Sequence, residues 1–221
     1  MNGIRAILFD LDGTLLDSAP DLVAALNWLR ESEGLPALEV GSMSRHVSRG
    51  AVGLILAGMP AAGNQQVETW KELFLARYAA KSFEKSRLYD GVPGLLDALA
   101  AAAIPWGIVT NKSEALTKPI LRAVGLLDTA SCVVCGDTLG RSKPDPAPVV
   151  WACHQLGVPL HETIFAGDDL RDLQAGRAAG TKTAIVHYGY GAFEIGDDLV
   201  ADSEQVHHPS DFVELLGLKH G

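Results

Sequence analysis

Short apolar runs recur along the chain and alternate with stretches of helical periodicity. The runs lie at residues 4–9, 106–109, 132–135, 163–166 and 183–186, and helical patterns occupy 93–103, 117–124, 147–156 and 170–179. Strands that are apolar on both faces and alternate with helices predict a parallel sheet covered on both sides. Right-handed crossovers then give a doubly wound, Rossmann-like α/β fold.

The region from Asp17 to about residue 87 breaks this alternation, because it contains helical patterns and no good strand. The two clearest helices place apolar side chains on one face: Leu22, Leu26 and Leu29 in the first, and Trp70, Phe74 and Tyr78 in the second. We therefore expect a core domain of residues 1–17 and 88–221, interrupted by an α-helical domain of residues 18–87. Within the core, Pro119 is costly in a helix interior, which predicts that Thr117 is the N-cap and that Pro119 lies in the first turn.

Composition and charge narrow the class of protein. The 221 residues carry a formal net charge of −9, with 48% hydrophobic and 20% charged residues, which is typical of a soluble globular protein. Nucleic acid and anionic membranes bind basic surfaces, so neither is an expected partner. An anionic substrate would have to be met by local cations, either lysine, arginine or a bound metal ion.

The three cysteines have no disulfide-framework spacing, which favours a reducing compartment. Cys132 and Cys135 lie in an apolar strand without a second cysteine pair, so buried structural thiols are the favoured interpretation. No targeting segment or membrane span is apparent, since the first apolar run ends at Asp10 and a later one is interrupted by Asp97 and Pro105. We expect a cytoplasmic protein.

Two carboxylates, Asp10 and Asp12, follow the first apolar strand in "FDLDGTL". Residues i and i+2 at a strand end point to the same side, toward the edge where open α/β sheets bind ligands. Like charges so close repel unless a cation lies between them, and Mg²⁺ prefers such oxygen ligands. A pair of solvated turn aspartates is the alternative, since Asp-Gly sequences mark turns.

Polar residues at the other strand ends favour a common site. They are Thr110 and Asn111 in "VTN", Lys143 in "SKPDP", and Asp168, Asp169 and Asp172 in "GDDLRD". Taken singly, each has an ordinary explanation as a turn, cap, surface or helix-dipole residue. No ordinary explanation covers all of them together, so the set predicts one polar site at the carboxyl edge of the sheet.

These four motifs, in this order and at these spacings, closely resemble the haloacid dehalogenase-like hydrolase superfamily, and the resemblance spans the whole chain. The sequence is most similar to bacterial phosphoglycolate phosphatases. The stretch "GDDLRDLQAGRAAGTKTAIVHYGY" also resembles a branch acting on N-acetylmuramic acid 6-phosphate. The helical insertion resembles the α-helical cap domain of the superfamily.

The resemblance implies a role for each matching residue. Asp10 is the expected nucleophile, which forms an aspartyl-phosphate, and Asp12 is the expected general acid and base. Thr110 and Asn111 would hold phosphoryl oxygens, and Lys143 would offset negative charge. The Asp10 carboxylate, the Asp12 main-chain carbonyl and Asp168 would hold Mg²⁺, with Asp172 supporting them; the role of Asp169 stays open.

The cap is expected to select the substrate. Its loop "RHVSRGAVG" resembles the specificity loop of family caps, and Ser48, Arg49 and Gly50 are the candidate binding residues. Arg49 could bind a substrate carboxylate, and an exposed arginine without such a role is the alternative.

The sequence as a whole predicts a Mg²⁺-dependent phosphatase acting on a small phosphorylated metabolite, such as 2-phosphoglycolate or N-acetylmuramic acid 6-phosphate. A sugar-phosphate phosphotransferase or mutase is an open alternative, because those relatives also keep an acid at Asp12. A phospho-accepting regulatory protein is disfavoured, because such proteins lack both that acid and the helical insertion. Neither the physiological substrate nor the oligomeric state follows from the sequence.

Overall fold

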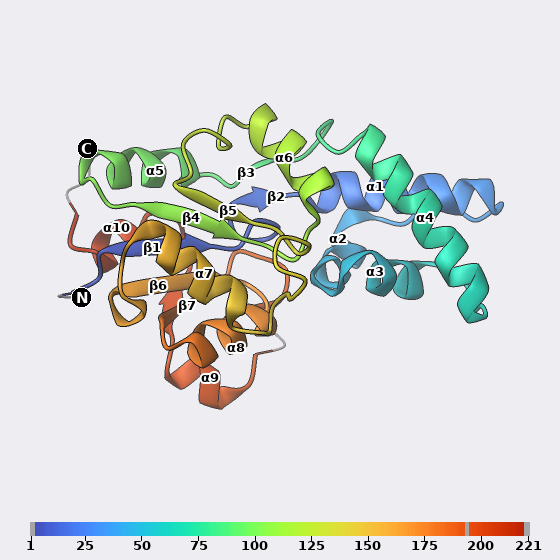
Figure 1. Ribbon diagram of the computed structural model, residues 1–221. Helices are drawn as coiled ribbons and strands as arrows, with labels where there is room; N and C mark the ends of the chain where they lie inside the picture. Colours follow the sequence, from blue (N-terminus) through green and yellow to red (C-terminus); the bar gives the residue numbers. More distant parts are fainter. Residues whose placement is uncertain (1–2, 193–194, 219–221) are drawn as a thin grey trace. The chain divides into compact units, whose positions relative to one another are not determined.

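The structure, a computed structural model, describes residues 3–192 and 195–218. The chain divides into two compact units, one formed by Met1–Leu16 with Leu88–Gly221 and the other by Asp17–Arg87. The first, here the core unit, contains a large β-sheet, and the second, here the helical unit, consists mainly of helices (Figure 1).

A sheet of parallel strands forms the centre of the core unit. In spatial order the strands are β5 (Cys132–Val134), β4 (Trp106–Val109), β1 (Ala6–Phe9), β6 (Thr163–Gly167), β7 (Lys182–Val186) and β8 (Glu204–Val206). The chain extends the sheet from β1 to β4 and β5, then returns to add β6, β7 and β8 on the other side. This is a doubly wound parallel sheet, and the predicted fold class is confirmed. The edge strand β8 was not expected, because its sequence Glu-Gln-Val lacks an apolar run.

Helices cover both faces of this sheet. They are α5 (Val92–Ala101), α6 (Glu114–Ala123), α7 (Ala147–Leu156), α8 (Leu170–Ala179), α9 (Asp197–Ala201) and α10 (Asp211–Leu215), with a 3-10 turn at Leu160–Glu162. Leu8 and Phe165 pack with α7 and α8 on one face. Phe9, the next residue, points to the opposite face, where its ring meets Phe212 of α10 edge-on at 5.4 Å between centroids. The apolar alternation of each strand therefore serves two layers of helices.

Helix α6 begins earlier than the sequence suggested. Its first residue is Glu114, with Ser113 at the N-cap position, so the prediction that Thr117 starts this helix is wrong. Pro119 lies inside the helix and cannot donate to the carbonyl of Ala115 four residues before it. Ala115 is exposed, so water can satisfy that carbonyl, and the helix tolerates the proline.

The helical unit contains α1 (Ala19–Ser32), α2 (Val40–Met43), a 3-10 helix (Ser44–Arg49), α3 (Gly50–Gly58) and α4 (Asn64–Ala80). On the predicted apolar face of α1, Leu26 and Leu29 are fully covered and Leu22 is half-buried. On that of α4, Trp70, Phe74 and Tyr78 are all buried. Short strands β2 (Leu16–Asp17) and β3 (Arg87–Leu88) pair where the chain passes between the units. Across the described part of the chain, no helix is long and apolar enough to span a membrane.

A buried carboxylate joins the two ends of the helical unit. Asp21, in the first turn of α1, is 4% exposed. Its Oδ2 accepts the main-chain N–H of Ser86 at 2.8 Å and the Ser86 hydroxyl at 2.6 Å, and its Oδ1 accepts the N–H of Lys85 at 3.0 Å. Because hydrogen bonds to an ionised group are among the stronger ones, this carboxylate fixes the last residues of the unit against its first helix.

We expect Asp21→Ala to lower the free energy of unfolding by about 2–4 kcal/mol, because it leaves the buried N–H and hydroxyl of Ser86 without their acceptor. Urea denaturation followed by circular dichroism measures the change. The exposed Glu72 on α4 offers a control, and Glu72→Ala should change stability by less than about 0.5 kcal/mol. An Asp21→Ala protein as stable as this control would show that the clamp contributes nothing.

Candidate active site

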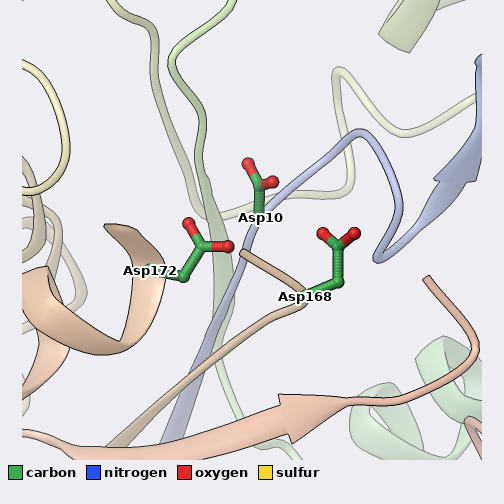
Figure 2. Close-up of side chains that lie close together, drawn as sticks. All are labelled: Asp10, Asp168 and Asp172. Atoms are coloured by element: carbon green, nitrogen blue, oxygen red, sulfur yellow. The ribbon is translucent and has the colours of Figure 1, made fainter. Parts of the chain in front are cut away.

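Carboxylates meet at the point where the order of the strands reverses. Asp10 follows β1, and Asp168 follows the neighbouring strand β6, while Asp172 lies in the first turn of α8. One oxygen from each lies within 4.8 Å of the others, and all three side chains are buried (Figure 2). We call these residues the carboxylate cluster. The carboxyl edge of a sheet at such a reversal is where open α/β folds bind ligands.

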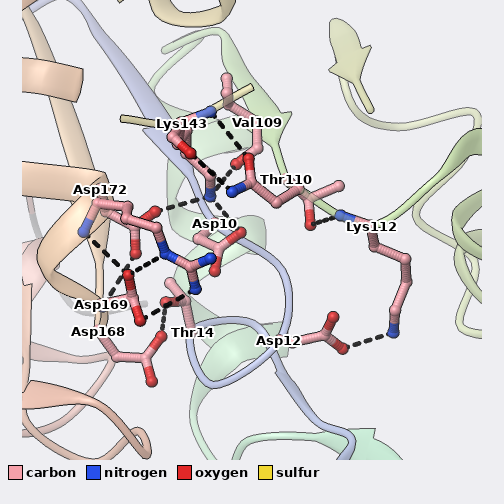
Figure 3. A network of polar contacts seen from close by, with 12 residues as sticks. Asp10, Asp12, Thr14, Val109, Thr110, Lys112, Lys143, Asp168, Asp169 and Asp172 are labelled. Atoms are coloured by element: carbon pink, nitrogen blue, oxygen red, sulfur yellow. Dashed lines mark hydrogen bonds and ion pairs between the residues drawn. The ribbon is translucent and has the colours of Figure 1, made fainter. Parts of the chain in front are cut away.

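A buried lysine lies against the carboxylate cluster. Nζ of Lys143 is 2.7 Å from Oδ1 of Asp10 and 2.7 Å from Oδ1 of Asp172 (Figure 3). It also donates to the main-chain carbonyl of Val109 at 2.8 Å. Lys143 is 4% exposed, so its charge acts on the two carboxylates with little screening by solvent. Lys143 contacts two of the three acids of the cluster, so the carboxylates outnumber the lysine paired with them.

Asn111 positions the loop that carries this lysine. Its side-chain Nδ2 donates to the main-chain carbonyl of Lys143 at 2.9 Å, and its Oδ1 accepts the Lys143 N–H at 2.9 Å. The neighbouring Thr110 is 4% exposed, and its Oγ1 accepts the N–H of Lys112 at 3.2 Å. Asn111 was expected to hold a phosphoryl oxygen, and that role stays a prediction. The structure gives Asn111 a further role, which is to hold the main chain of Lys143 in place.

The pKa values of the cluster reflect burial first and charge second. Burial raises the pKa of Asp10, Lys143 opposes the rise, and the charge of Asp12 adds to it. Burial raises the pKa of Asp172 to about 7, again against Lys143. Asp168 has a pKa well above its usual value through burial and the charges of Asp10 and Asp172. Burial alone would lower the pKa of Lys143, but Asp10 and Asp172 raise it, so the lysine stays charged.

Asp168 is held by a loop that sequence reasoning missed. Its Oδ2 accepts the N–H groups of Tyr190 at 2.7 Å and Gly191 at 3.1 Å, and Thr14 donates to its Oδ1 at 3.4 Å. Gly13 has φ of +87°, and a Cβ there would collide with the Asp168 carboxylate. The sequence feature that could have pointed to this loop is the glycine-rich "YGYG" after β7. That feature alone does not show that the loop binds Asp168.

Asp12 has a different partner from Asp10. Its Oδ1 is 2.7 Å from Nζ of Lys112, a lysine that follows Asn111 in the "VTNKS" motif (Figure 3). The Asp12 side chain is not part of the carboxylate cluster. Strand β1 ends at Phe9, so the alternation of side chains along a strand no longer governs Asp12. Lys112 was not singled out from the sequence, because one lysine after a motif carries no signal of what it contacts.

Asp169 caps helix α8. The carboxylate of Asp169 accepts the main-chain N–H of Arg171 at 2.9 Å and the side-chain Nε–H of Arg171 at 2.7 Å. The main-chain N–H of Asp169 donates to Oδ2 of Asp172 at 3.0 Å. This reciprocal arrangement is a capping box. Asp169 thus fixes the helix turn that carries Asp172, which gives the residue a structural role that the sequence left open.

The remaining predicted residues belong to the helical unit. Ser48 and Arg49 lie at the end of the 3-10 helix, and Gly50, with φ of +71°, begins α3. Arg49 and Gly50 are exposed and Ser48 is half-buried. The other predicted residues all lie in the core unit, at or beside the carboxyl edge of its sheet.

The carboxylate cluster has the chemistry of a site for a hard divalent cation. Its three converging atoms are all carboxylate oxygens, the ligands that Mg²⁺ and Ca²⁺ prefer. Burial, together with the charges of neighbouring acids, raises the pKa of each of the three, so a bound cation would favour their ionised forms. Asp10 and Asp168 belong to the predicted ligand set, and Asp172, paired with Lys143, adjoins them.

Comparison with known proteins identifies the class. A model of the haloacid dehalogenase-like hydrolase family matches residues 4–180. The N-acetylmuramic acid 6-phosphate phosphatase of Pseudomonas aeruginosa is 40% identical over 219 residues, covering 96% of this chain and 95% of that protein. The phosphoglycolate phosphatase of Xanthomonas campestris pv. campestris (strain 8004) is 39% identical over 194 residues, covering 88% and 86%.

A solved structure with a similar fold leads to the same class. The crystal structure of a predicted phosphoglycolate phosphatase from Haemophilus somnus 129pt matches with a TM-score of 0.85 and 26% identity, over 98% of this chain and 99% of that one. A doubly wound sheet with acids where the strand order reverses is typical of α/β proteins that bind a ligand at that edge. Within that class, the chain belongs to the haloacid dehalogenase-like hydrolase family. The resemblance and the prediction of a hydrolytic enzyme are confirmed.

The carboxylate of Asp168 is expected to destabilise the folded protein when no metal ion is bound. In chelator at alkaline pH, we expect Asp168→Asn to raise the melting temperature by about 2–6 °C, because it removes a carboxylate whose charge is disfavoured by burial and by Asp10 and Asp172, and it keeps an acceptor oxygen for Tyr190 and Gly191. An acid whose pKa is raised on folding destabilises the folded state above that pKa. The gain should therefore shrink as the pH falls through the raised pKa of Asp168. A melting temperature for the variant that stays below that of the wild type at alkaline pH would contradict this account.

Proposed function

We propose that this protein is a Mg²⁺-dependent phosphatase that hydrolyses a small phosphomonoester through an aspartyl-phosphate on Asp10. The observation that carries the proposal is the pairing of Asp10 with the buried Lys143 at 2.7 Å inside the carboxylate cluster. The names of the two relatives, a phosphoglycolate phosphatase and an N-acetylmuramic acid 6-phosphate phosphatase, support the same class of reaction.

In the first step, an Asp10 carboxylate oxygen attacks phosphorus while the bond from phosphorus to the leaving oxygen breaks. Lys143 holds Asp10 in one orientation and offsets part of the charge that gathers on the carboxylate and the phosphoryl group. Thr110, at the end of β4, is the residue proposed to donate its hydroxyl to a phosphoryl oxygen. These groups stand on strand ends and short loops, so little reorganisation is needed during the reaction.

Asp12 is the proposed general acid and base. It gives a proton to the leaving alcohol in the first step. In the second step it takes a proton from the water that attacks phosphorus, while the bond from phosphorus to the Asp10 oxygen breaks and inorganic phosphate leaves. The proton gained from water restores the acid for the next cycle. Two neighbouring aspartates can take different roles because they have different partners, Lys143 for Asp10 and Lys112 for Asp12.

The donor set of the cluster fits Mg²⁺, with the Asp10 carboxylate, the Asp12 main-chain carbonyl and Asp168 as the proposed ligands. When bound, the ion would neutralise negative charge on the transferring phosphoryl group. Asp168 is suited to this role because two main-chain N–H groups and Thr14 fix its orientation.

The substrate class is proposed to be small phosphorylated acids and sugars, with 2-phosphoglycolate and N-acetylmuramic acid 6-phosphate as the candidates. The core-unit residues described above recognise a phosphoryl group and a leaving oxygen, and they cannot tell one alcohol from another. We therefore assign substrate selection to the helical unit, through Ser48, Arg49 and Gly50. Both candidate substrates carry a carboxylate, which an arginine can bind.

We expect Asp10→Asn to abolish turnover of p-nitrophenyl phosphate and of both candidate substrates, because an amide cannot act as the nucleophile. Phosphate release by the wild type should stop in chelator and return with Mg²⁺. The exposed Asp97 on α5 supplies the control, and Asp97→Asn should keep full activity. Full turnover by the wild type in excess chelator, or by purified Asp10→Asn, would refute the metal or the covalent step respectively.

For specificity, we expect Arg49→Ala to lower kcat/KM for 2-phosphoglycolate by roughly ten- to hundredfold, the loss of a charge-assisted hydrogen bond. The effect on p-nitrophenyl phosphate, which has no carboxylate, should be small. Arg45 is an exposed arginine on the same 3-10 helix, so Arg45→Ala is a matched control. Equal losses on both substrates would assign Arg49 to the fold or to phosphate instead of specificity.

A further inference from the structure

Lys112 is a second lysine of the site, and the proposed function names it as the partner of Asp12 without giving it a part in the reaction. Its Nζ lies 2.7 Å from Oδ1 of Asp12, with its side chain 7% exposed and that of Asp12 21% exposed (Figure 3). Solvent-exposed ion pairs of lysine are weak because long side chains move and water screens the charges. This pair is largely removed from water, so the charges interact more strongly.

The main chain of Lys112 is fixed on both sides of its side chain. Its N–H donates to Oγ1 of Thr110 at 3.2 Å. Its carbonyl accepts the N–H of Gly136 at 2.9 Å and the hydroxyl of Thr117 at 3.4 Å. The residue that binds a phosphoryl oxygen in the proposed mechanism is therefore the same residue that anchors Lys112. A fixed main chain and a buried stem restrict where the ammonium group can lie.

Asp12 itself needs such a partner. Its main chain bridges to Leu16, and the next N–H, of Gly13, donates to the Leu16 carbonyl at 2.9 Å, so the backbone of the turn is set. These contacts do not set the rotation of the Asp12 side chain. The carboxylate lies outside the cluster of Asp10, Asp168 and Asp172, and Lys112 is the cation beside it.

We propose that Lys112 is the positioning residue of the general acid and base, and that it holds the Asp12 carboxylate apart from Asp10, on the side where the leaving oxygen departs. The inference rests on the proposed function, because it assigns Lys112 to a step of that reaction. The site then contains two matched ion pairs, one that orients the nucleophile and one that orients the group that transfers the proton. Lys112 acts through Asp12 and does not itself touch the reacting atoms.

Substrates with different leaving groups distinguish a residue that positions the general acid from one that binds phosphate or stabilises the fold. When an alkyl phosphate such as 2-phosphoglycolate reacts, the bond to the leaving oxygen breaks as Asp12 supplies a proton, and the alcohol departs neutral. Nitrophenolate is a stable anion and departs without that proton. Asp12 also serves in the second step, which is the same for both substrates because the aspartyl-phosphate is the same. Only the first step therefore distinguishes the two substrates. The rate of that step is measured in a single turnover, as the release of alcohol or nitrophenolate.

We expect Lys112→Met and Lys112→Gln to slow the single-turnover release of glycolate by about ten- to hundredfold, the loss that follows misplacement of a catalytic group. The nitrophenolate burst should slow by less than about threefold. Lys112→Arg, which keeps the charge, should recover much of the glycolate rate. Lys118→Met is the matched control, because Lys118 is an exposed lysine on α6 paired with Glu114, and it should behave as the wild type.

A double-mutant cycle tests whether Lys112 acts through Asp12. In an Asp12→Ala background, adding Lys112→Met should cause no further loss of glycolate release, because the group it positions is gone. Equal losses on both substrates, or the same loss with and without Asp12, would overturn the inference and assign Lys112 to phosphate binding or to the fold. Wild-type rates in both charge-removing variants would also overturn it. A wild type that releases neither product refutes the proposed function itself, which keeps the two failures distinct.

Discussion

The contact of Lys143 with Asp10 and Asp172 is the interaction on which the rest of the site depends. Buried carboxylates repel each other, and an ammonium group between two of them offsets part of that cost. The geometry of the lysine is set by Asn111, whose amide holds the main chain on both sides, and by the Val109 carbonyl. The position of Asp10 therefore depends on three separate segments of the core unit.

The arrangement of acids shows how one site keeps two similar groups distinct. Asp10 is in contact with Lys143 inside the carboxylate cluster, and Asp12, two residues later, is paired with Lys112 outside it. Burial and surrounding charges act on the cluster, whose pKa values rise. Asp168 is oriented by main-chain N–H groups, which cannot neutralise it, so a cation remains the natural complement.

Local contacts also support the site from outside. The capping box of Asp169 and Asp172 fixes the start of α8, and Gly13 allows the β1 loop to approach Asp168 where a side chain would collide. In the helical unit, Asp21 binds residues 85 and 86 and so closes the unit on itself. The capping box is local in sequence, whereas the contacts of Gly13 with Asp168 and of Asp21 with residues 85 and 86 join segments far apart along the chain.

The sequence by itself determined the parallel sheet, the helical insertion and the strand ends that carry polar residues, because burial on both faces leaves a periodic apolar pattern. It did not determine β8, whose short edge strand is too polar to show that pattern, or the start of α6, where an exposed carbonyl tolerates Pro119. Only the tertiary structure decided that Lys112 pairs with Asp12, that Asn111 supports Lys143, and that the loop at Tyr190 holds Asp168. Each of these pairings joins side chains or main-chain groups from separate segments. Their relative directions are set only when the segments pack together in the folded protein.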